Sequence, residues 1–426
     1  MLPKTAVNNF KEFVKYLLGS KLILLGISIY LLFSISALLP NHFMDYFFFG
    51  SSVHYCCKGL DFYGIPNGVY SFLHGGDLSG SRLPVGIGQY SENHLSNPND
   101  YHPLFSLIIG FFLIQFNPDT SFNSLILVKI FITFFAVFYI YKNFKDNKYL
   151  NLAIFLFLSN FSTYNETRIS QYQFFFNIFF LLFLINISKN KDKYEGGLIY
   201  FLTLISKPIS LLWVPVLLIK KKITEAVVGL FLFIVSTLTF VKLGIDKHYL
   251  QNLIYHLSNS SSAWSIDYMS LDAFLRHNFG INPTTVKTLK WSSLILIYLL
   301  SFLKKTNVLT SLFLLTVYFL FFYDNLFQYH FSVLTPIITV CLLNVKEFQT
   351  KIAKILIIII NLPTVFFILR FSHFQFYFDP IYGPNPTYLG WSMVSFFQLL
   401  PIFLLAFYVL IITLRQSNLK HEIHKS

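Results

Sequence analysis

The sequence is poor in charged residues. Asp, Glu, Lys and Arg together make up 12% of the chain, whereas 55% of it is hydrophobic and 19% is aromatic. Soluble domains carry about twice that share of charge. The apolar residues come in long runs separated by short polar connections, which is the spacing that bilayer-spanning helices require. The composition therefore excludes a soluble globular protein and predicts an all-α, polytopic integral membrane protein.

Cysteine is also scarce, with three residues in the whole chain. Cys56 and Cys57 are adjacent and cannot easily bridge each other, while Cys341 lies in an apolar segment. This pattern excludes a disulfide framework and the ligand spacing of a zinc site. Ligand-like spacing is equally missing among the histidines of the longest polar stretch, His54, His74 and His94. The sequence thus indicates no metal and no other cofactor.

The sequence shows neither an internal repeat nor a soluble domain, so residues 1–426 are expected to form a single membrane domain. Its formal net charge of +13 comes from lysines that gather where apolar segments end. We call these groups the basic clusters: 142–148, 189–193, 220–222, 304–305, 346–354 and 420–425. Lysines in such positions set membrane topology and contact anionic lipid. They do not indicate a nucleic-acid partner.

The apolar segments predict about twelve transmembrane helices. They are 22–39, 103–116, 123–141, 149–165, 172–187, 196–219, 223–243, 285–303, 308–323, 331–345, 355–371 and 391–414. The first is expected to be an anchor, because it is long and no small-residue cleavage site follows it. Lysines before it and in the tail place both termini in the cytoplasm, with the chain in a bacterial inner (cell) membrane.

One conflict leaves two arrangements open. With twelve full spans, the basic clusters at 142–148 and 189–193 face outward, against the preference of lysine for the cytoplasmic side. If 103–116 only dips into the membrane and 196–219 folds back at Lys207 and Pro208, both clusters move inside. The two arrangements agree from Lys220 onward.

The longest polar stretch, 40–102, is expected to be the first external loop, and 244–284 the second. The first loop carries Asp61 among aromatic residues, where a carboxylate suits a general base that deprotonates a sugar hydroxyl. An Asx turn or a helix cap is the alternative. Asp77 could be a base, a ligand or a turn residue. Arg82 could bind a phosphate or could simply be solvated.

Other candidate residues lie beside or inside apolar segments. Lys207 stands within an apolar run, where a charge tends to mark a substrate pathway or a ligand site. An equally good alternative is that the side chain extends along the helix so that its ammonium reaches the membrane–water interface. A polar cluster in YNETRISQYQ holds Glu166, Arg168, Gln171 and Gln173; a connecting loop with a Glu–Arg pair is the alternative. His330 could donate to a phosphate or a sugar, or belong to an aromatic belt. Lys129 and Glu225 are further intramembrane charges without a motif.

Six segments, in order along the chain, resemble the polyprenyl-phosphate-mannose-dependent alpha-mannosyltransferases of the GT-C superfamily, glycosyltransferase family 87. They are DFYGIPNGVYSFLHGGDL, YHPLFSLIIGFFL, SQYQFFFNIFFLLFL, GLIYFLTLISKPISLLWVPVLLIKKK, the stretch 260–276 and DNLFQYHFSVLTPI. Three positions depart from the family pattern: His102 replaces the first of two prolines, Ser170 replaces a glycine, and Tyr329 replaces a histidine. These departures concern the identity of the donor and the acceptor more than the fold.

The resemblance implies a GT-C-like fold and an inverting transfer of a hexose such as mannose. The donor would be a polyprenyl phosphate sugar, and the acceptor a glycolipid or glycan of the cell envelope, with the active site on the external face. By position in the motifs, Asp61 would be the base, and Lys207, His330 and Arg168 would bind the donor phosphate. Remaining substrate contacts would come from Asp77, Arg82, Gln171 and His102. No metal or other cofactor is implied.

Two rival functions remain open. Intramembrane charges and many spans also suit a lipid-linked sugar flippase or a polysaccharide transporter. A transporter has no evident need for a long external loop beside a carboxylate, and transporters often show two similar halves. An O-antigen-type polymerase is the other rival, although its large loop usually lies late in the chain.

Overall fold

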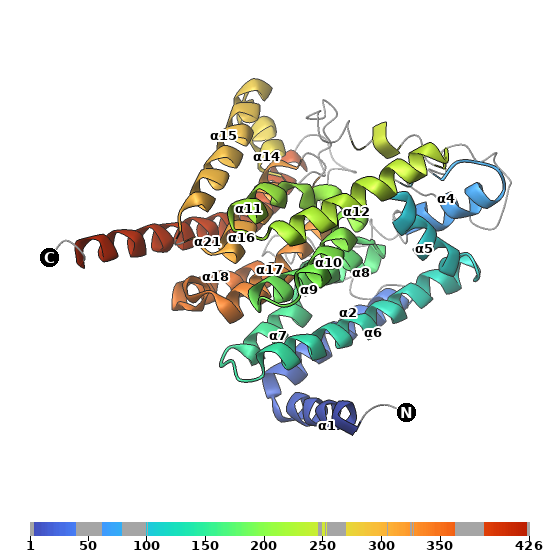
Figure 1. Ribbon diagram of the computed structural model, residues 1–426, viewed down its shortest axis with the longest axis horizontal. Coiled ribbons are helices and arrows are strands. Elements are labelled where there is room, and N and C mark those ends of the chain that lie inside the picture. Colours follow the sequence, from blue (N-terminus) through green and yellow to red (C-terminus); the bar gives the residue numbers. More distant parts are fainter. Residues whose placement is uncertain are drawn as a thin grey trace.

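The computed structural model describes residues 4–39, 62–78, 99, 101–245, 249–251, 253, 270–304, 306–323, 326, 328–362 and 387–423 (Figure 1). Within these ranges the regular structure is helical throughout, which confirms the all-α prediction. The α-helices are α1 (Lys4–Gly19), α2 (Lys21–Leu38), α4 (Gly64–Leu73), α5 (Pro103–Leu113), α6 (Pro118–Phe144), α7 (Leu150–Ser159), α8 (Phe161–Ile169), α9 (Gln173–Ser188), α10 (Lys193–Ser206), α11 (Val214–Ile219), α12 (Ile223–Lys242), α14 (Leu271–Phe279), α15 (Pro283–Phe302), α16 (Val308–Phe322), α17 (Leu334–Asn344), α18 (Lys351–Asn361) and α21 (Thr387–Ile423). Three 3₁₀ helices are η2 (Pro208–Trp213), η3 (Gln328–Val333) and η4 (Lys346–Gln349).

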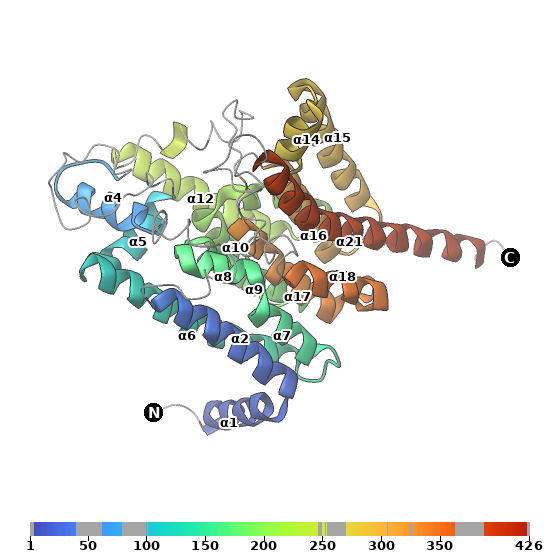
Figure 2. The same ribbon diagram turned by 180° about the vertical axis from the view of Figure 1, so that it is seen from behind.

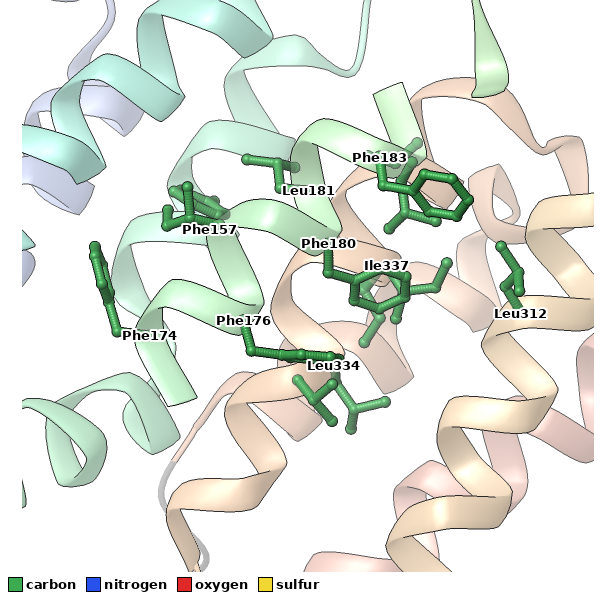
Figure 3. Packing of buried hydrophobic residues seen from close by; sticks show 14 of the residues in the cluster. Phe157, Phe174, Phe176, Phe180, Leu181, Phe183, Leu312, Leu334 and Ile337 are labelled. Atoms are coloured by element: carbon green, nitrogen blue, oxygen red, sulfur yellow. The ribbon is translucent and has the colours of Figure 1, made fainter. Parts of the chain in front are cut away.

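Helix α9 is the centre of the packing. Its phenylalanines are buried on several faces, and a helix that is apolar all round is expected to be enclosed by others. Phe176 and Phe180 lie beside Leu334 and Ile337 of α17, as Figure 3 shows. Phe180 also stacks on Trp213, with 4.3 Å between ring centroids. The neighbours of α9 are α6, α10, α17 and η3.

The prediction of twelve spans is wrong. In the part of the chain that the structure describes, four helices are long and apolar enough to cross a membrane: α2, α6, α12 and residues 396–415 of α21. These four helices indicate a membrane protein. Large apolar side chains stand on their outer faces, for example Phe131 of α6 at 76% exposure and Phe231 of α12 at 63%.

The physical reason is that several apolar runs do not form one continuous helix. The run 149–165 divides at Asn160, whose side chain accepts a hydrogen bond from Ser162 and caps α8. The run 103–116 contains only the 11-residue helix α5. At 1.5 Å per residue that helix is about 16 Å long, roughly half of a hydrocarbon core.

The run 196–219 folds back at Lys207 and Pro208. Helix α10 ends at Ser206, Lys207 is extended, and η2 with α11 returns alongside α10. The Tyr200 hydroxyl donates to the carbonyl oxygen of Ser210 at 2.7 Å, which joins the two arms. Both arms are too short to span a membrane. The structure therefore contains the fold-back that the sequence left as an alternative.

The fold-back makes α10 and α12 parallel. A Cβ added at Gly197 would lie 2.6 Å from the Cβ of Val228, and one at Gly229 would lie 2.5 Å from Cδ1 of Tyr200. Gly197 therefore pairs with Val228, and Tyr200, further along α10, pairs with Gly229, further along α12. Because the residue numbers increase together, the two helices run in the same direction. Only glycine lets the backbones approach this closely.

Most of the basic clusters meet at one end of the helices, which we call the basic end. Lys191 donates to the Tyr139 hydroxyl at 3.0 Å, and Lys222 donates to Asn190 at 2.9 Å. Lys220 donates to the carbonyl oxygen of Leu303 at 3.0 Å. Further lysines lie over aromatic rings: Lys189 over Phe144, and both Lys148 and Lys354 over Tyr149. The clusters 142–148 and 189–193 thus lie on the same side as 220–222.

Two stretches predicted as external loops contain helices. Helix α4 lies within 40–102 and packs against α5. Helix α14 lies within 244–284 and packs against α15, α16 and α21. Asp272 and Arg276 form an ion pair of 2.6 Å on α14. Figure 2 shows α21 beginning beside α14 and then projecting beyond the other helices.

Candidate functional site

The predicted site residues fall into three groups. Asp61 and Arg82 lie outside the described residues. Arg168, Gln171, Lys207 and His330 lie on neighbouring elements around the junction of α8 and α9. In the third group, His102 is the N-cap of α5 and Asp77 follows α4.

We call the second group the polar centre, together with three residues that contact it or belong to the same cluster. Its members are Lys129, Glu166, Arg168, Gln171, Gln173, Lys207 and His330. Apart from Lys207, which is half-buried, all of them are buried.

The junction between α8 and α9 forms because α8 ends on a left-handed residue. Ser170 has φ 53°, a conformation that usually requires glycine. The Gln171 amide then donates to the Glu166 carbonyl oxygen at 3.1 Å, which completes the helix cap. Serine adopts this conformation at some cost in strain.

An ion pair holds the junction to α6. Lys129 donates to Oε1 of Glu166 at 2.8 Å and to the Gln171 carbonyl oxygen at 2.7 Å. Both side chains of the pair are 1% exposed. The Phe174 amide also donates to Oε1 of Glu166, at 3.3 Å. A buried charge is costly unless it is paired and hydrogen-bonded, and here two of the bonds fix the turn itself.

The other half of the polar centre comes from the fold-back and from η3. Lys207 donates to Oε1 of Gln173, and its ammonium lies 5.9 Å from the centroid of the Tyr329 ring. That ring is 4.2 Å from the ring of His330. Lys207 stands at the tip of the fold-back because Pro208 cannot continue α10. The chain reversal thus brings an ammonium to η3.

Arg168 joins the same region from α8. The residue is 8% exposed, and its Nη2 donates to Oδ1 of Asn165 at 3.5 Å. Helix α8 packs directly on η3, the element that carries His330. The three residues predicted to bind a donor phosphate therefore come from three contacting or neighbouring elements.

Described parts of the first loop are anchored on the polar centre. The Tyr101 hydroxyl donates to Oε1 of Gln171 at 2.7 Å. The Tyr172 hydroxyl donates to the carbonyl oxygen of Phe62 at 2.9 Å, and the two rings stack at 6.2 Å. Phe62 is the residue that follows Asp61 in the chain. Aromatic side chains thus tie this loop to the α8–α9 junction.

His102 caps α5 and connects it to α12. Its Nδ1 accepts from the Leu104 amide at 3.1 Å, so in the neutral ring Nε2 carries the proton and donates to the Thr237 hydroxyl, also at 3.1 Å. The Thr237 hydroxyl in turn donates to the Phe233 carbonyl oxygen at 2.7 Å. Burial lowers the pKa of His102 to about 3. Both ring nitrogens are engaged within the protein, and the substrate-binding role stays a prediction.

Asp77 follows α4 and is partly exposed. The backbone before it turns through Gly75, which has φ 84°. The carbonyl oxygen of the next residue, Leu78, accepts from Asn99 at 3.0 Å. Asp77 therefore belongs to a turn that is tied to the start of α5, and its role as base or ligand stays a prediction.

Sequence reasoning singled out no role for Lys129 or Tyr172. Lys129 carried a usable signal, since it is a lone charge in an apolar run. Its partner, Glu166, lies 37 positions along the chain, and no motif links the two. Tyr172 carried no signal at all, because a tyrosine between two glutamines fits any loop or helix start.

The polar centre lies far from the basic end. Helices α9 and α10 each reach from one to the other: α9 begins at Gln173 and ends beside Lys189, and α10 begins at Lys193 and ends beside Lys207. Helix α9 has 16 residues and α10 has 14, so at 1.5 Å per residue that separation is a little over 20 Å, about 20 Å along the shorter helix. The described residues contain no group of three or more His, Cys, Asp or Glu that could hold a metal ion.

The sequence matches no model of a known protein family, and no curated protein matches it. The likeness to the mannosyltransferases of glycosyltransferase family 87 is carried by the quoted motifs alone.

Proposed function

We propose that the chain is a membrane glycosyltransferase. It moves a hexose such as mannose from a polyprenyl phosphate donor to a glycolipid or glycan of the cell envelope. The observation that supports the proposal is that Arg168, Lys207 and His330, which are distant in sequence, lie on elements around one junction. Helix α8 packs on η3, and the Tyr329 ring lies 5.9 Å from the Lys207 ammonium and beside the ring of His330. Such a set suits the phosphate of the donor.

The proposed reaction is a single inverting displacement. A hydroxyl oxygen of the acceptor bonds to the anomeric carbon while the bond from that carbon to the phosphate oxygen breaks. The hydroxyl proton passes to the carboxylate of Asp61, and polyprenyl phosphate leaves with the bonding electrons. Lys207, Arg168 and His330 stabilise the charge that grows on the phosphate. Since that phosphate needs no proton near neutral pH, a second acid is unnecessary.

Gln171, Gln173 and Lys129 have supporting parts in this scheme. Gln173 accepts from Lys207 and donates to Asn177 at 3.1 Å, which orients the ammonium. Lys129 holds the turn that carries Gln171 and Gln173. Asp77, Arg82 and His102 remain proposed contacts to substrate.

The proposal includes an orientation in a bacterial inner membrane. Lysine prefers the cytoplasmic side, so the basic end and both termini face the cytoplasm. The polar centre, about 20 Å along the helices, then lies toward the external face. The short helix α5 and the fold-back at Lys207 and Pro208 support this orientation, because they allow the clusters 142–148 and 189–193 to lie inside.

A lipid-linked sugar flippase is the second candidate. The ion pair of Lys129 and Glu166 favours it, because Lys129 lies within α6, a candidate span, and buried ionisable pairs in spans often line transport pathways. The same pair also serves as a clamp on the α8–α9 turn, which a transferase needs equally.

One assay separates the two functions. Membranes containing the protein are incubated with radiolabelled polyprenyl phosphate mannose and a lipid extract of the host, and the products are separated by chromatography. We expect label in a new species, with a loss of at least 100-fold in Asp61→Asn and in Lys207→Met. Lys189→Met, the same change at the basic end, should keep full activity.

The other outcomes are equally informative. Label that changes leaflet without a new product would support the flippase. If Asp77→Asn abolishes transfer and Asp61→Asn does not, the base is Asp77. If no labelled product forms with any acceptor, mannose is not the sugar transferred.

A further inference from the structure

Helix α1 has two different apolar faces. Phe13 and Leu17 are buried, and the Phe13 ring packs on Phe138 and Tyr141 of α6 at 5.1 and 5.4 Å. One helical turn apart from each other, Phe10, Val14 and Leu18 form a second row that stays exposed, at 57%, 36% and 66%. Residues four positions apart share a helix face, so the exposed residues make a continuous apolar stripe.

Lysines border the stripe. Lys11 and Lys15 each follow a stripe residue by one position, and both are exposed. Asn9 and Glu12 occupy the remaining side. An apolar face with lysines along its edge is typical of a helix that lies flat in the membrane interface.

The place of α1 in the fold agrees with this pattern. The chain turns at Gly19 and Ser20, and Ser20 caps α2, which is long and apolar enough to cross a membrane. Both ribbon views show α1 bent away from the line of α2 (Figures 1 and 2). Helix α1 contacts the end of α6 that leads into the cluster 142–148, where Lys142, Lys145 and Lys148 are exposed.

We propose that α1 lies in the plane of the membrane interface at the basic end and binds anionic phospholipid. Phe10, Val14 and Leu18 enter the boundary between headgroups and acyl chains. Lys11 and Lys15, with Lys142 and Lys145 of the adjacent cluster, contact the lipid phosphates. Charge complementarity and the direct continuation into α2 identify lipid as the occupant of the stripe. This surface is independent of the proposed transferase reaction.

The test measures the depth of single nitroxide labels. Cys56 and Cys57 are replaced by Ser, and one cysteine is introduced at position 10, 11, 15 or 18 of the full chain. The labelled proteins are placed in nanodiscs of phosphatidylcholine, with or without one third phosphatidylglycerol. Power saturation with oxygen and with nickel ethylenediaminediacetate then reports whether each label faces lipid or water.

We expect labels at Phe10 and Leu18 to favour oxygen, and labels at Lys11 and Lys15 to favour the nickel complex. Phosphatidylglycerol should deepen the first two labels. In the variant Lys142→Gln/Lys145→Gln, most of this dependence on phosphatidylglycerol should be lost. The control variant Lys287→Gln/Lys290→Gln, on α15, should retain it.

Two results would overturn the proposal. The stripe is not in the interface if labels at Phe10 and Leu18 are as accessible to the nickel complex as the label at Lys11. Protection that appears in detergent and rises with protein concentration would assign the stripe to a second copy of the chain. Amide exchange of residues 4–19 in the unmodified protein gives a check without substitutions, since it should slow when phosphatidylglycerol is added.

Discussion

The polar centre and the basic end are joined by the same helices, yet charged side chains are mostly buried at the first and mostly exposed at the second. At the polar centre, Lys129 and Glu166 are buried and bonded to each other and to the backbone. At the basic end, most lysines are exposed or lie over aromatic rings, as Lys189 does on Phe144. Burial makes each charge of the first region depend on a particular partner, whereas water can replace most contacts of the second.

This difference predicts where a single substitution should lower the stability of the protein. A lysine that water solvates can be removed at little cost, and its contribution adds to that of its neighbours. A buried lysine leaves an uncompensated carboxylate when it is removed. The three predictions below test that contrast, beginning with the largest effect.

The largest effect is expected from Lys129→Met. The change leaves Glu166 buried without its cation and should lower the free energy of unfolding by about 3–5 kcal/mol. Adding Glu166→Gln should restore part of the loss, because the remaining side chain is neutral. Thermal unfolding in nanodiscs compares both variants with the unchanged chain.

The matched control is Lys142→Met, the same substitution on the same helix at an exposed position. Its effect should stay within about 0.5 kcal/mol. Equal losses at positions 129 and 142 would contradict the contrast between the two regions.

A moderate effect is expected from acid, through His102. Its pKa is lowered from 6.5 to about 3 in the folded chain, so below pH 6.5 the unfolded chain binds a proton that the folded chain does not. The contribution of His102 to stability is therefore complete above pH 6.5 and declines as the pH falls toward 3. The loss is about 1.4 kcal/mol for each pH unit in that window.

Melting temperatures between pH 7.5 and 4.5 measure this effect. His102→Asn keeps a residue that can cap α5 and should show a shallower decline than the unchanged chain. His74→Asn, at an exposed histidine, should leave the decline as it is. A decline that is identical in all three proteins would show that another group causes it.

The smallest effect is expected from Ser170→Gly. Ser170 and Lys221 both have left-handed backbone, with φ 53° and 59°, but Ser170 lies at the polar centre and Lys221 at the basic end. Glycine relieves about 1 kcal/mol of strain at either position, less the entropy it adds to the unfolded chain. Both Ser170→Gly and Lys221→Gly should therefore raise the melting temperature slightly.

The pair also tests the site. Ser170→Gly relieves the left-handed backbone without adding a side chain and should keep the proposed transfer activity, whereas Ser170→Val should reduce both stability and activity because a β-branched residue fits this conformation poorly. Lys221→Val should reduce stability alone. A loss of activity in Ser170→Gly would show that the serine hydroxyl itself takes part.

By itself, the sequence determined the class of the protein. Low charge and long apolar runs predict membrane helices because unsatisfied backbone groups cannot be exposed to lipid. A local signal was also useful: Pro208 supported a fold-back of the run 196–219 as one of two open arrangements, and the structure contains that fold-back. The left-handed backbone of Ser170 became evident only in the structure. The residues Arg168, Gln171, Lys207 and His330 could be selected from their motifs and their placement near apolar segments.

Only the tertiary structure decided how many runs are continuous helices and which distant residues meet. A hydropathy pattern shows where apolar residues are concentrated. It does not predict that the helix within 103–116 is short, or that α10 and α12 run parallel. The pairing of Lys129 with Glu166 depends on the packing of α6 against α9, to which no local pattern refers. Contacts between segments far apart in the chain arise from side-chain packing, which a linear pattern does not encode.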